Sequence, residues 1–241
     1  MNHKILNKLE RKFGRFAIPN LMMIVIFGMA LVFLIDTFIN PEYTFNLSSL
    51  IMFSREDILA GQVWRILTFV FLPPSYSIIF IAFTLYFYYL IGTALESQWG
   101  SFRFNVYYFT GIIGSIIVGL ITGFATNDYL NMTLFLAFAM LFPNFEVMLF
   151  FFIPVKIKWL AWLDSALMFV SFLFSSWPQR FALLVAFANF LFFFGPELVY
   201  HGKMITRRIG LKFKKKKYTP NEHKQNWKNH WWDDHNNNPF Q

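Results

Sequence analysis

The sequence predicts an all-α integral membrane protein with six transmembrane helices. Hydrophobic residues make up 56% of the 241 residues, whereas charged residues make up only 14%, which is far less charge than an ordinary soluble domain carries. A helix needs about 20 apolar residues to cross a bilayer. The chain has six long runs without Asp, Glu, Lys or Arg, which are 16–35, 66–95, 104–127, 129–145, 165–179 and 181–196.

Composition and charge exclude several classes of protein. The chain has no Cys, which rules out a disulfide scaffold, a thiolate zinc site and a cysteine nucleophile. The net charge of +8 comes from basic clusters that flank the first and last apolar runs, where Lys and Arg stay cytoplasmic and meet anionic lipid headgroups. We therefore predict lipid contact and no nucleic-acid partner. The tail's His and Asp residues are too loosely spaced for a selective metal site, and no cofactor is predicted.

Three regions follow from the pattern. Residues 1–18 predict an amphipathic arm on the cytoplasmic surface, because Leu6, Leu9 and Phe13 share one helical face and basic residues occupy the other. Residues 19–201 form the membrane domain, and the basic, Asn-rich segment 202–241 is predicted to be a disordered cytoplasmic tail.

Breaks in the apolar pattern divide the membrane domain into helices. Charged residues and Pro predict an interfacial loop over 40–75, between the first and second helices, and an interfacial or re-entrant segment over 144–157. The predicted spans are about 20–39, 76–97, 102–124, 128–142, 158–174 and 179–200.

The distribution of basic residues supports six spans with both termini in the cytoplasm. In this topology 18 of the 21 Lys and Arg residues are cytoplasmic, and the outer loops hold only Arg55, Arg65 and Arg180. Such a bias is typical of the positive-inside rule.

The third span carries the clearest packing signal. Gly111, Ser115, Gly119 and Gly123 recur every four residues, so one face of the helix is almost bare backbone and another helix can approach closely. We interpret this face as packing within the bundle rather than as a homodimer interface.

Several short motifs resemble those of the rhomboid superfamily. Trp64-Arg65 followed by Thr68 resembles the Trp-Arg-x-x-Thr element of the first outer loop in rhomboids and derlins. Glu96, Trp99 and Gly100 resemble the junction between their second and third spans, and Leu141-Phe142-Pro143 resembles the end of their fourth span. The resemblance covers residues 20–200 and implies a six-helix rhomboid-like bundle in a bacterial plasma membrane. Trp64, Arg65 and Thr68 would then lie at the interface with lipid or substrate, where the Arg65 guanidinium could hold lipid phosphate or backbone carbonyls.

The catalytic groups that this resemblance implies are missing. Rhomboid proteases use a Ser in Gly-x-Ser-Gly and a His on the sixth span, but here Asp128 stands at the Ser position and Phe187 lies in the region of the His. Phe80 and Thr84 stand where the oxyanion-stabilising His and Asn would be. The resemblance therefore implies an inactive relative that binds transmembrane segments of client proteins.

Two alternatives remain open from the sequence. One is a serine protease with an unrecognised site that uses Ser165 or Thr133. The other is a small transporter or channel that uses the acidic residues Asp36, Asp164 and Glu197. We expect Asp164 and Glu197 instead to pair with nearby Lys and Arg.

The topology gives a first prediction. Reporter fusions after residue 241 and within the 40–60 loop should report opposite sides of the membrane, because six spans return the chain to its starting side. Activity of both reporters on one side would contradict the six-span topology.

Overall fold

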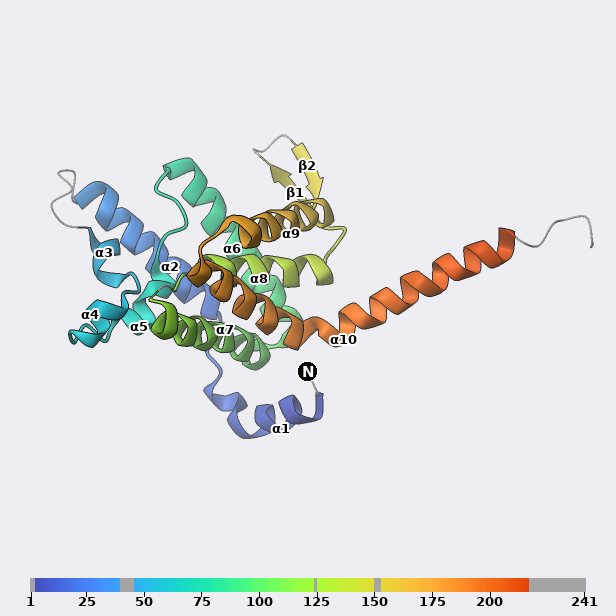
Figure 1. The fold of residues 1–241 in the computed structure, drawn as a ribbon, viewed down its shortest axis with the longest axis horizontal. Helices are drawn as coiled ribbons and strands as arrows, with labels where there is room; N and C mark the ends of the chain where they lie inside the picture. The colour runs from blue at the N-terminus through green and yellow to red at the C-terminus, as the bar shows by residue number, and fades with distance from the viewer. Residues whose placement is uncertain (1–2, 40–45, 124, 150–152, 217–241) are drawn as a thin grey trace, which may run out of the picture. The chain divides into compact units, whose positions relative to one another are not determined.

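A computed structural model describes residues 3–39, 46–123, 125–149 and 153–216 (Figure 1). The chain divides into two compact units, Met1–Gly195 and Pro196–Gln241. The elements, in chain order, are α1 (His3–Phe13), η1 (Gly14–Phe16), α2 (Leu21–Leu34), η2 (Ile35–Ile39), α3 (Leu47–Ile51), α4 (Arg55–Leu59), α5 (Arg65–Thr68), η3 (Phe69–Phe71), α6 (Ile78–Trp99), α7 (Ser101–Thr122), α8 (Asp128–Leu141), β1 (Glu146–Leu149), β2 (Ile153–Lys156), α9 (Ile157–Phe174) and α10 (Trp177–Lys216).

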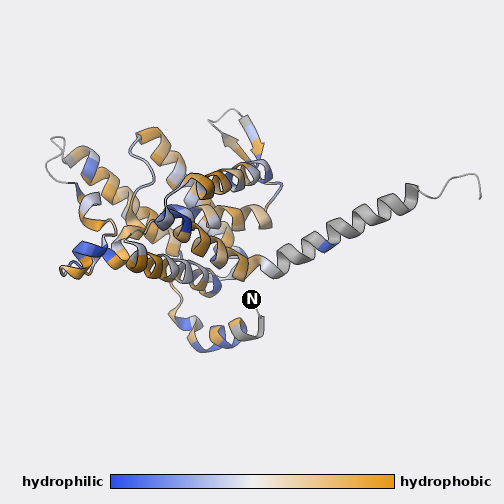
Figure 2. Ribbon diagram, in the orientation of Figure 1, coloured by the Kyte–Doolittle hydropathy of each residue, from blue (hydrophilic) through white to orange (hydrophobic). Residues whose placement is uncertain are grey.

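The fold is mostly helical, and five of the described helices are long and apolar enough to cross a membrane. They are Leu21–Phe38, Ile78–Trp99, Ser101–Thr122, Ile157–Phe174 and Trp177–Gly195. Figure 2 shows these segments as largely hydrophobic ribbons, whereas hydrophilic residues gather on the arm α1 and around α4. The prediction of an integral membrane protein is thus supported by helix length as well as by composition.

The helix α8 differs from these five because it has only 14 residues. At about 1.5 Å per residue it is about 21 Å long, shorter than a hydrocarbon core of about 30 Å. Its residues are nevertheless well buried, and Thr133, Leu134 and Ala137 are fully so. It packs against α6, α7 and α9, so α8 lies in the core of the first unit.

Two paired strands lie within the segment over 144–157, which was predicted to be interfacial or re-entrant. Strands β1 and β2 pair antiparallel with Glu146 opposite Lys156, and their side chains form an ion pair of 3.7 Å. The aromatic and β-branched residues of this segment favour strands over helix. The described part of the chain is therefore not all-α, although the hairpin is its only sheet.

The long helix α10 extends to Lys216. Residues 202–216, which were predicted to be disordered, are therefore helical. The remainder of the predicted tail, 217–241, lies outside the described residues.

The glycines of α7 contact both a loop and a helix, whereas only helix packing was expected. A Cβ on Gly119 would lie 2.6 Å from the ring of Phe53, which belongs to the loop between α3 and α4, and a Cβ on Gly111 would overlap Leu130 of α8. Gly123 does not share this face, because it ends α7 with φ +83° and has open space around it. The small-residue face therefore packs against the Phe53 ring at one end and against α8 at the other.

The tightest helix approach lies between α2 and α6, at a position that the sequence pattern did not single out. A Cβ on Gly92 would overlap the Cβ of Met22, an atom fixed directly to the α2 backbone. Relief of this overlap requires the two helices to move apart, since a side-chain rotation cannot move a Cβ.

Gly92→Ala should therefore lower the free energy of unfolding by about 1–3 kcal/mol, the usual cost of overpacking. Thermal unfolding in detergent measures the effect. Gly195→Ala is the matched control, because a Cβ there meets no atom within 4 Å and Ala is the better helix former. Equal midpoints for the two variants would contradict the close α2–α6 packing.

Candidate functional site

Polar side chains gather in the interior of the helices α6 to α9. Two lie on α8 and two on α7, with one from each of the outer helices α6 and α9. The tyrosine hydroxyls lie close to the other members, since Tyr88 interacts electrostatically with Asp164 and Tyr108 and lies beside the amide of Asn131. We call this set the polar cluster; it consists of Tyr88, Tyr107, Tyr108, Asn131, Thr133 and Asp164.

Several polar atoms of this cluster lack a hydrogen bond of good geometry among the described residues, although the Tyr107 hydroxyl lies near Thr133 and the Asn131 amide near the Tyr88 hydroxyl. They are the hydroxyls of Tyr107 and Tyr108, both amide atoms of Asn131, and Oδ2 of Asp164. A buried group left unpaired costs about 1–3 kcal/mol. Because native interiors pair nearly all such groups, this concentration marks the polar cluster as a candidate site for a polar group from outside the chain.

Hydrogen bonds fix the start of α8, one turn before the polar-cluster residues of that helix. Asn127 is buried, and its amide donates hydrogen bonds of 2.9 and 3.0 Å to the carbonyls of Val70 and Leu72. The Thr126 hydroxyl donates to Asp128 Oδ2 at 2.7 Å and accepts from the Asp128 N–H. The segment that aligns with the rhomboid nucleophile motif thus serves as a helix start, and Asp128 lies exposed in the first turn, where a carboxylate favours the helix dipole.

The other positions aligned with rhomboid catalytic residues carry no catalytic arrangement. Phe80 is exposed, and the Thr84 hydroxyl donates back to the Phe80 carbonyl within α6 at 2.8 Å. Phe187 of α10 is exposed and stacks near Phe190. Among the described residues, no hydrogen bond or ion pair joins these side chains to Asp128.

The Trp-Arg-x-x-Thr element organises the loop between α2 and α6. Arg65 is only 5% exposed; its guanidinium donates to the carbonyls of Ser49 and Met52 at 2.7 and 2.9 Å, and it pairs with Asp57 at 3.3 Å. Thr68 donates to the Ile51 carbonyl at 3.1 Å. The Trp64 indole N–H donates to Leu50 at 3.2 Å, with the ring half exposed.

This arrangement favours one of the two roles expected for Arg65. Its donors are engaged by backbone carbonyls, Asp57 and the Gln62 side chain, so it binds backbone carbonyls rather than a lipid phosphate. Trp64 keeps an exposed ring that suits the headgroup region. Of the three residues predicted at a substrate or lipid interface, Arg65 and Thr68 therefore stabilise the loop.

The motif between the second and third spans closes the other end of the bundle. Glu96 Oε1 accepts hydrogen bonds from the Asn20 N–H at 2.8 Å and the Ser101 hydroxyl at 2.6 Å, at the starts of α2 and α7. Gly100 has a φ of +79° between α6 and α7, a backbone conformation that residues with a Cβ rarely adopt. The Trp99 ring packs 5.2 Å from that of Phe194. The motif thus joins four helices.

The acidic residues are not neutralised as the sequence analysis expected. Asp36 is buried, and it accepts hydrogen bonds from the N–H groups of Leu47 and Ser48 at the start of α3, at 2.6 and 3.1 Å, and from Tyr76. Burial raises the pKa of Tyr76, and the charge of Asp36 adds to this effect. The expected ion pair of Asp164 with Lys or Arg is wrong for the described residues, because Lys156 pairs with Glu146 and Arg103 with Glu10. The Glu197 side chain lies outside the described residues.

Sequence reasoning missed most of the polar cluster. It considered Asp164 and Thr133 singly, but Tyr88, Tyr107, Tyr108 and Asn131 lie in apolar runs with no motif around them. One signal was available, since Asn131 is an amide within a predicted membrane span and such residues rarely face lipid.

No family model, curated protein or solved structure matches this chain. The description of the site therefore depends on the residues themselves.

Arg65→Ala should destabilise the protein by about 3 kcal/mol, because it leaves the carbonyls of the loop and the Asp57 carboxylate without their partner. Arg65→Lys should recover only part of the loss, since an ammonium group cannot reach several acceptors with a planar fork. Thermal unfolding measures both variants. Arg55→Ala is the control, because Arg55 is exposed and makes only a long contact of 3.4 Å. An unchanged midpoint for Arg65→Ala would show that the loop does not depend on this side chain.

Proposed function

We propose that the chain is a catalytically inactive, rhomboid-like membrane protein that binds the transmembrane segments of client membrane proteins. In this proposal α8 also crosses the membrane, which gives six spans and places both termini in the cytoplasm. Burial supports a crossing by so short a helix, since neighbouring helices rather than lipid cover it. The proposed location is a bacterial-type plasma membrane, with anionic lipids around the basic flanks.

The observation that carries this proposal is the loose seam between α6 and α9. Both helices pack against α8, but close packing between the two is lacking among the described elements. Only 11% of α9 is buried, against 50% of α7, so most of α9 faces away from the other described helices. The polar cluster lies at this seam, because Tyr88 comes from α6 and Asp164 from α9.

Lateral entry at this seam would bring a client helix to the unpaired atoms of the polar cluster. In hydrocarbon a polar side chain of a client has few partners of its own, and interhelical hydrogen bonds can hold it. The amide of Asn131 offers both a donor and an acceptor, and Asp164 offers an acceptor. These groups favour a client with a polar or basic residue within its span.

The surroundings of the two alternative nucleophiles, Thr133 and Ser165, support the proposed lack of catalytic activity. The Thr133 hydroxyl is buried and donates to the Leu130 carbonyl at 2.8 Å within its own helix. Ser165 is exposed on α9. The sequence has no His between His3 and His201, so no residue from 4 to 200 offers either hydroxyl an imidazole base.

Client binding can be tested with a photoreactive amino acid at Leu160, which packs at the edge of the core on α9. Irradiation of native membranes should give discrete crosslinked proteins, whose mass spectra should contain a transmembrane segment. In the background Tyr88→Cys/Asp164→Cys, a short bismaleimide should close the seam and abolish these crosslinks. The chain has no native Cys, so the reagent acts only at the introduced pair.

Two controls make this result interpretable. The double-Cys variant without bismaleimide separates closure of the seam from loss of the two side chains. A photoreactive residue at Phe174, which is 83% exposed at the end of α9, should give crosslinks that closure leaves unchanged. Persistence of the Leu160 crosslinks after closure would contradict entry at the seam.

The purified protein should neither cleave rhomboid-type transmembrane substrates nor react covalently with a serine-directed fluorophosphonate. Loss of one member of a nucleophile–base pair removes nearly all of its effect, and here both aligned members are absent. Intact-mass spectrometry and gel-based cleavage assays measure the two outcomes. Stoichiometric labelling at Ser165 or Thr133 together with specific cleavage would restore the protease alternative.

A further inference from the structure

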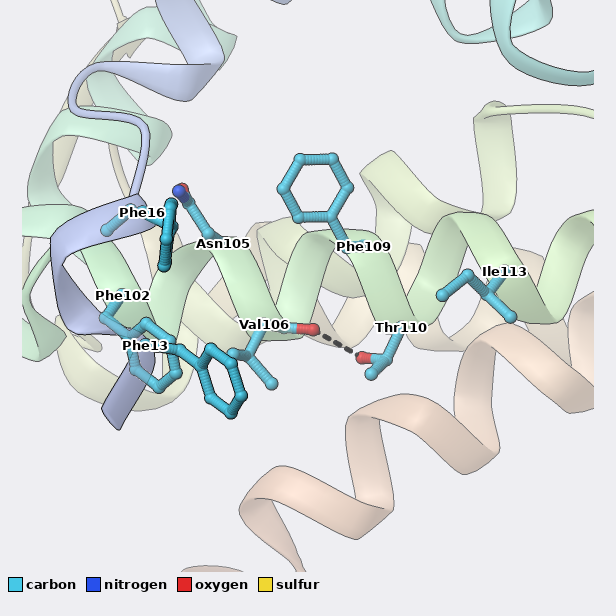
Figure 3. A pocket seen from close by; sticks show the side chains of 9 residues that line it. Phe13, Phe16, Phe102, Asn105, Val106, Phe109, Thr110 and Ile113 are labelled. Atoms are coloured by element: carbon cyan, nitrogen blue, oxygen red, sulfur yellow. Dashed lines mark hydrogen bonds between the residues drawn. The ribbon is translucent and has the colours of Figure 1, made fainter. Parts of the chain in front are cut away.

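A groove of about 300 Å³ lies between the arm and α7 (Figure 3). Its walls are almost entirely apolar, with Phe13 and Phe16 from the arm and Val106, Phe109 and Ile113 from α7. Figure 3 shows the arm rings at one end of the groove and Ile113 at the other. The groove therefore extends from the basic arm along the side of a membrane-spanning helix.

Specific contacts hold the arm at this distance from α7. Arg103 donates to Glu10 Oε2 from two of its nitrogens, both at 3.0 Å, and to Asn7 Oδ1 at 3.0 Å. The Asn105 amide donates to the Ile18 carbonyl at 3.1 Å. These contacts come from both ends of the arm, so the groove has fixed walls.

Positive charge borders the groove at its arm end. Lys12 lies 5.3 Å from the ring centre of Phe13, and Arg15 lies 4.8 Å from that of Phe16. Both cations are exposed, as are Lys8 and Arg11. The one ion pair that involves the described arm joins Glu10 to Arg103, so these four cations lack a carboxylate partner there.

One polar atom within the groove also lacks a partner. Asn105 is only 5% exposed, and its Oδ1 accepts no hydrogen bond from the described residues. Figure 3 shows its amide beside Phe16, at the arm end.

From this combination we propose that the groove binds one anionic glycerophospholipid, with an acyl chain along α7 and the phosphate beside Lys12 and Arg15. Apolar walls fit the hydrocarbon chain, and basic residues near an anionic headgroup attract it. The lipid would fasten the arm to the membrane domain at a defined place, which general attraction of a basic segment to a charged surface does not do. This inference does not depend on client binding.

The test uses the full-length protein in detergent and phosphatidylglycerol that carries a photoreactive diazirine in its acyl chain. Peptide mass spectrometry should locate the crosslink within residues 102–113. Excess unlabelled phosphatidylglycerol should compete, whereas the same excess of phosphatidylcholine should not. Equal competition by the two lipids, or labelling spread over the other helices, would overturn the proposal.

Matched variants separate the groove from the general lipid surface. Ile113→Trp fills the groove and should reduce crosslinking at least fivefold. Ile117→Trp is the control, because Ile117 is equally exposed at 54% on the same helix but does not line the groove. Equal crosslinking of the two variants would show that the lipid does not occupy the groove.

A second pair of variants tests the headgroup site even if the groove-filling variant fails to fold. Lys12→Gln/Arg15→Gln should weaken the apparent affinity for phosphatidylglycerol about tenfold, as judged by native mass spectrometry. Lys8→Gln/Arg11→Gln removes the same charge from the same arm but leaves the groove border intact, and it should change the affinity less than threefold. Equal losses would mean that the arm attracts anionic lipid only through its net charge.

Discussion

Backbone groups of a non-helical segment at the edge of a bilayer have little water to bind, and an unpaired group there costs several kcal/mol. The segment between α2 and α6 meets this constraint largely through one side chain. Arg65 reaches the carbonyls of Ser49 and Met52 from a buried position. Asp36 performs the complementary task, because it accepts from the N–H groups that begin α3. The Arg65 cation thus binds carbonyls and the Asp36 anion binds amide N–H groups, and together they stabilise this segment.

The presence of backbone hydrogen-bond partners distinguishes polar residues that stabilise the fold from those that are candidates for function. Glu96, Asp36, Arg65 and Asn127 each find backbone partners, so their burial is accounted for by the fold. The polar cluster is different, since its hydroxyls and amide atoms have side-chain neighbours but few hydrogen bonds. In a membrane domain this difference separates polar residues that build the structure from those that remain free to bind.

The sequence predicted the membrane class and the long helices because hydrophobic length is a local property. It also indicated the importance of Arg65, Glu96 and Gly119, although it left Arg65 between lipid phosphate and backbone carbonyls and assigned Gly119 to a helix contact. The partner of a residue depends on tertiary structure: nothing near Gly119 in the sequence indicates that Phe53 would fill the space beside it. The sequence excluded a span over 144–157 but did not specify the pairing of the strands, because a short apolar segment beside Pro has no periodicity that separates a strand from a re-entrant turn. The polar cluster was missed because its members come from four helices.

The length of α8 has a consequence for the surrounding bilayer. A crossing by a 14-residue helix leaves a hydrophobic mismatch, which membranes accommodate by local thinning and by the inward movement of headgroups and water. Its ends, at Asp128 and near Pro143, would then lie deeper than those of the neighbouring spans. A helix that approached from the side would experience a thinner and more polar slab there than in the open bilayer. The protein could therefore lower the barrier for a polar transmembrane residue by changing the lipid around it, before any direct contact is made.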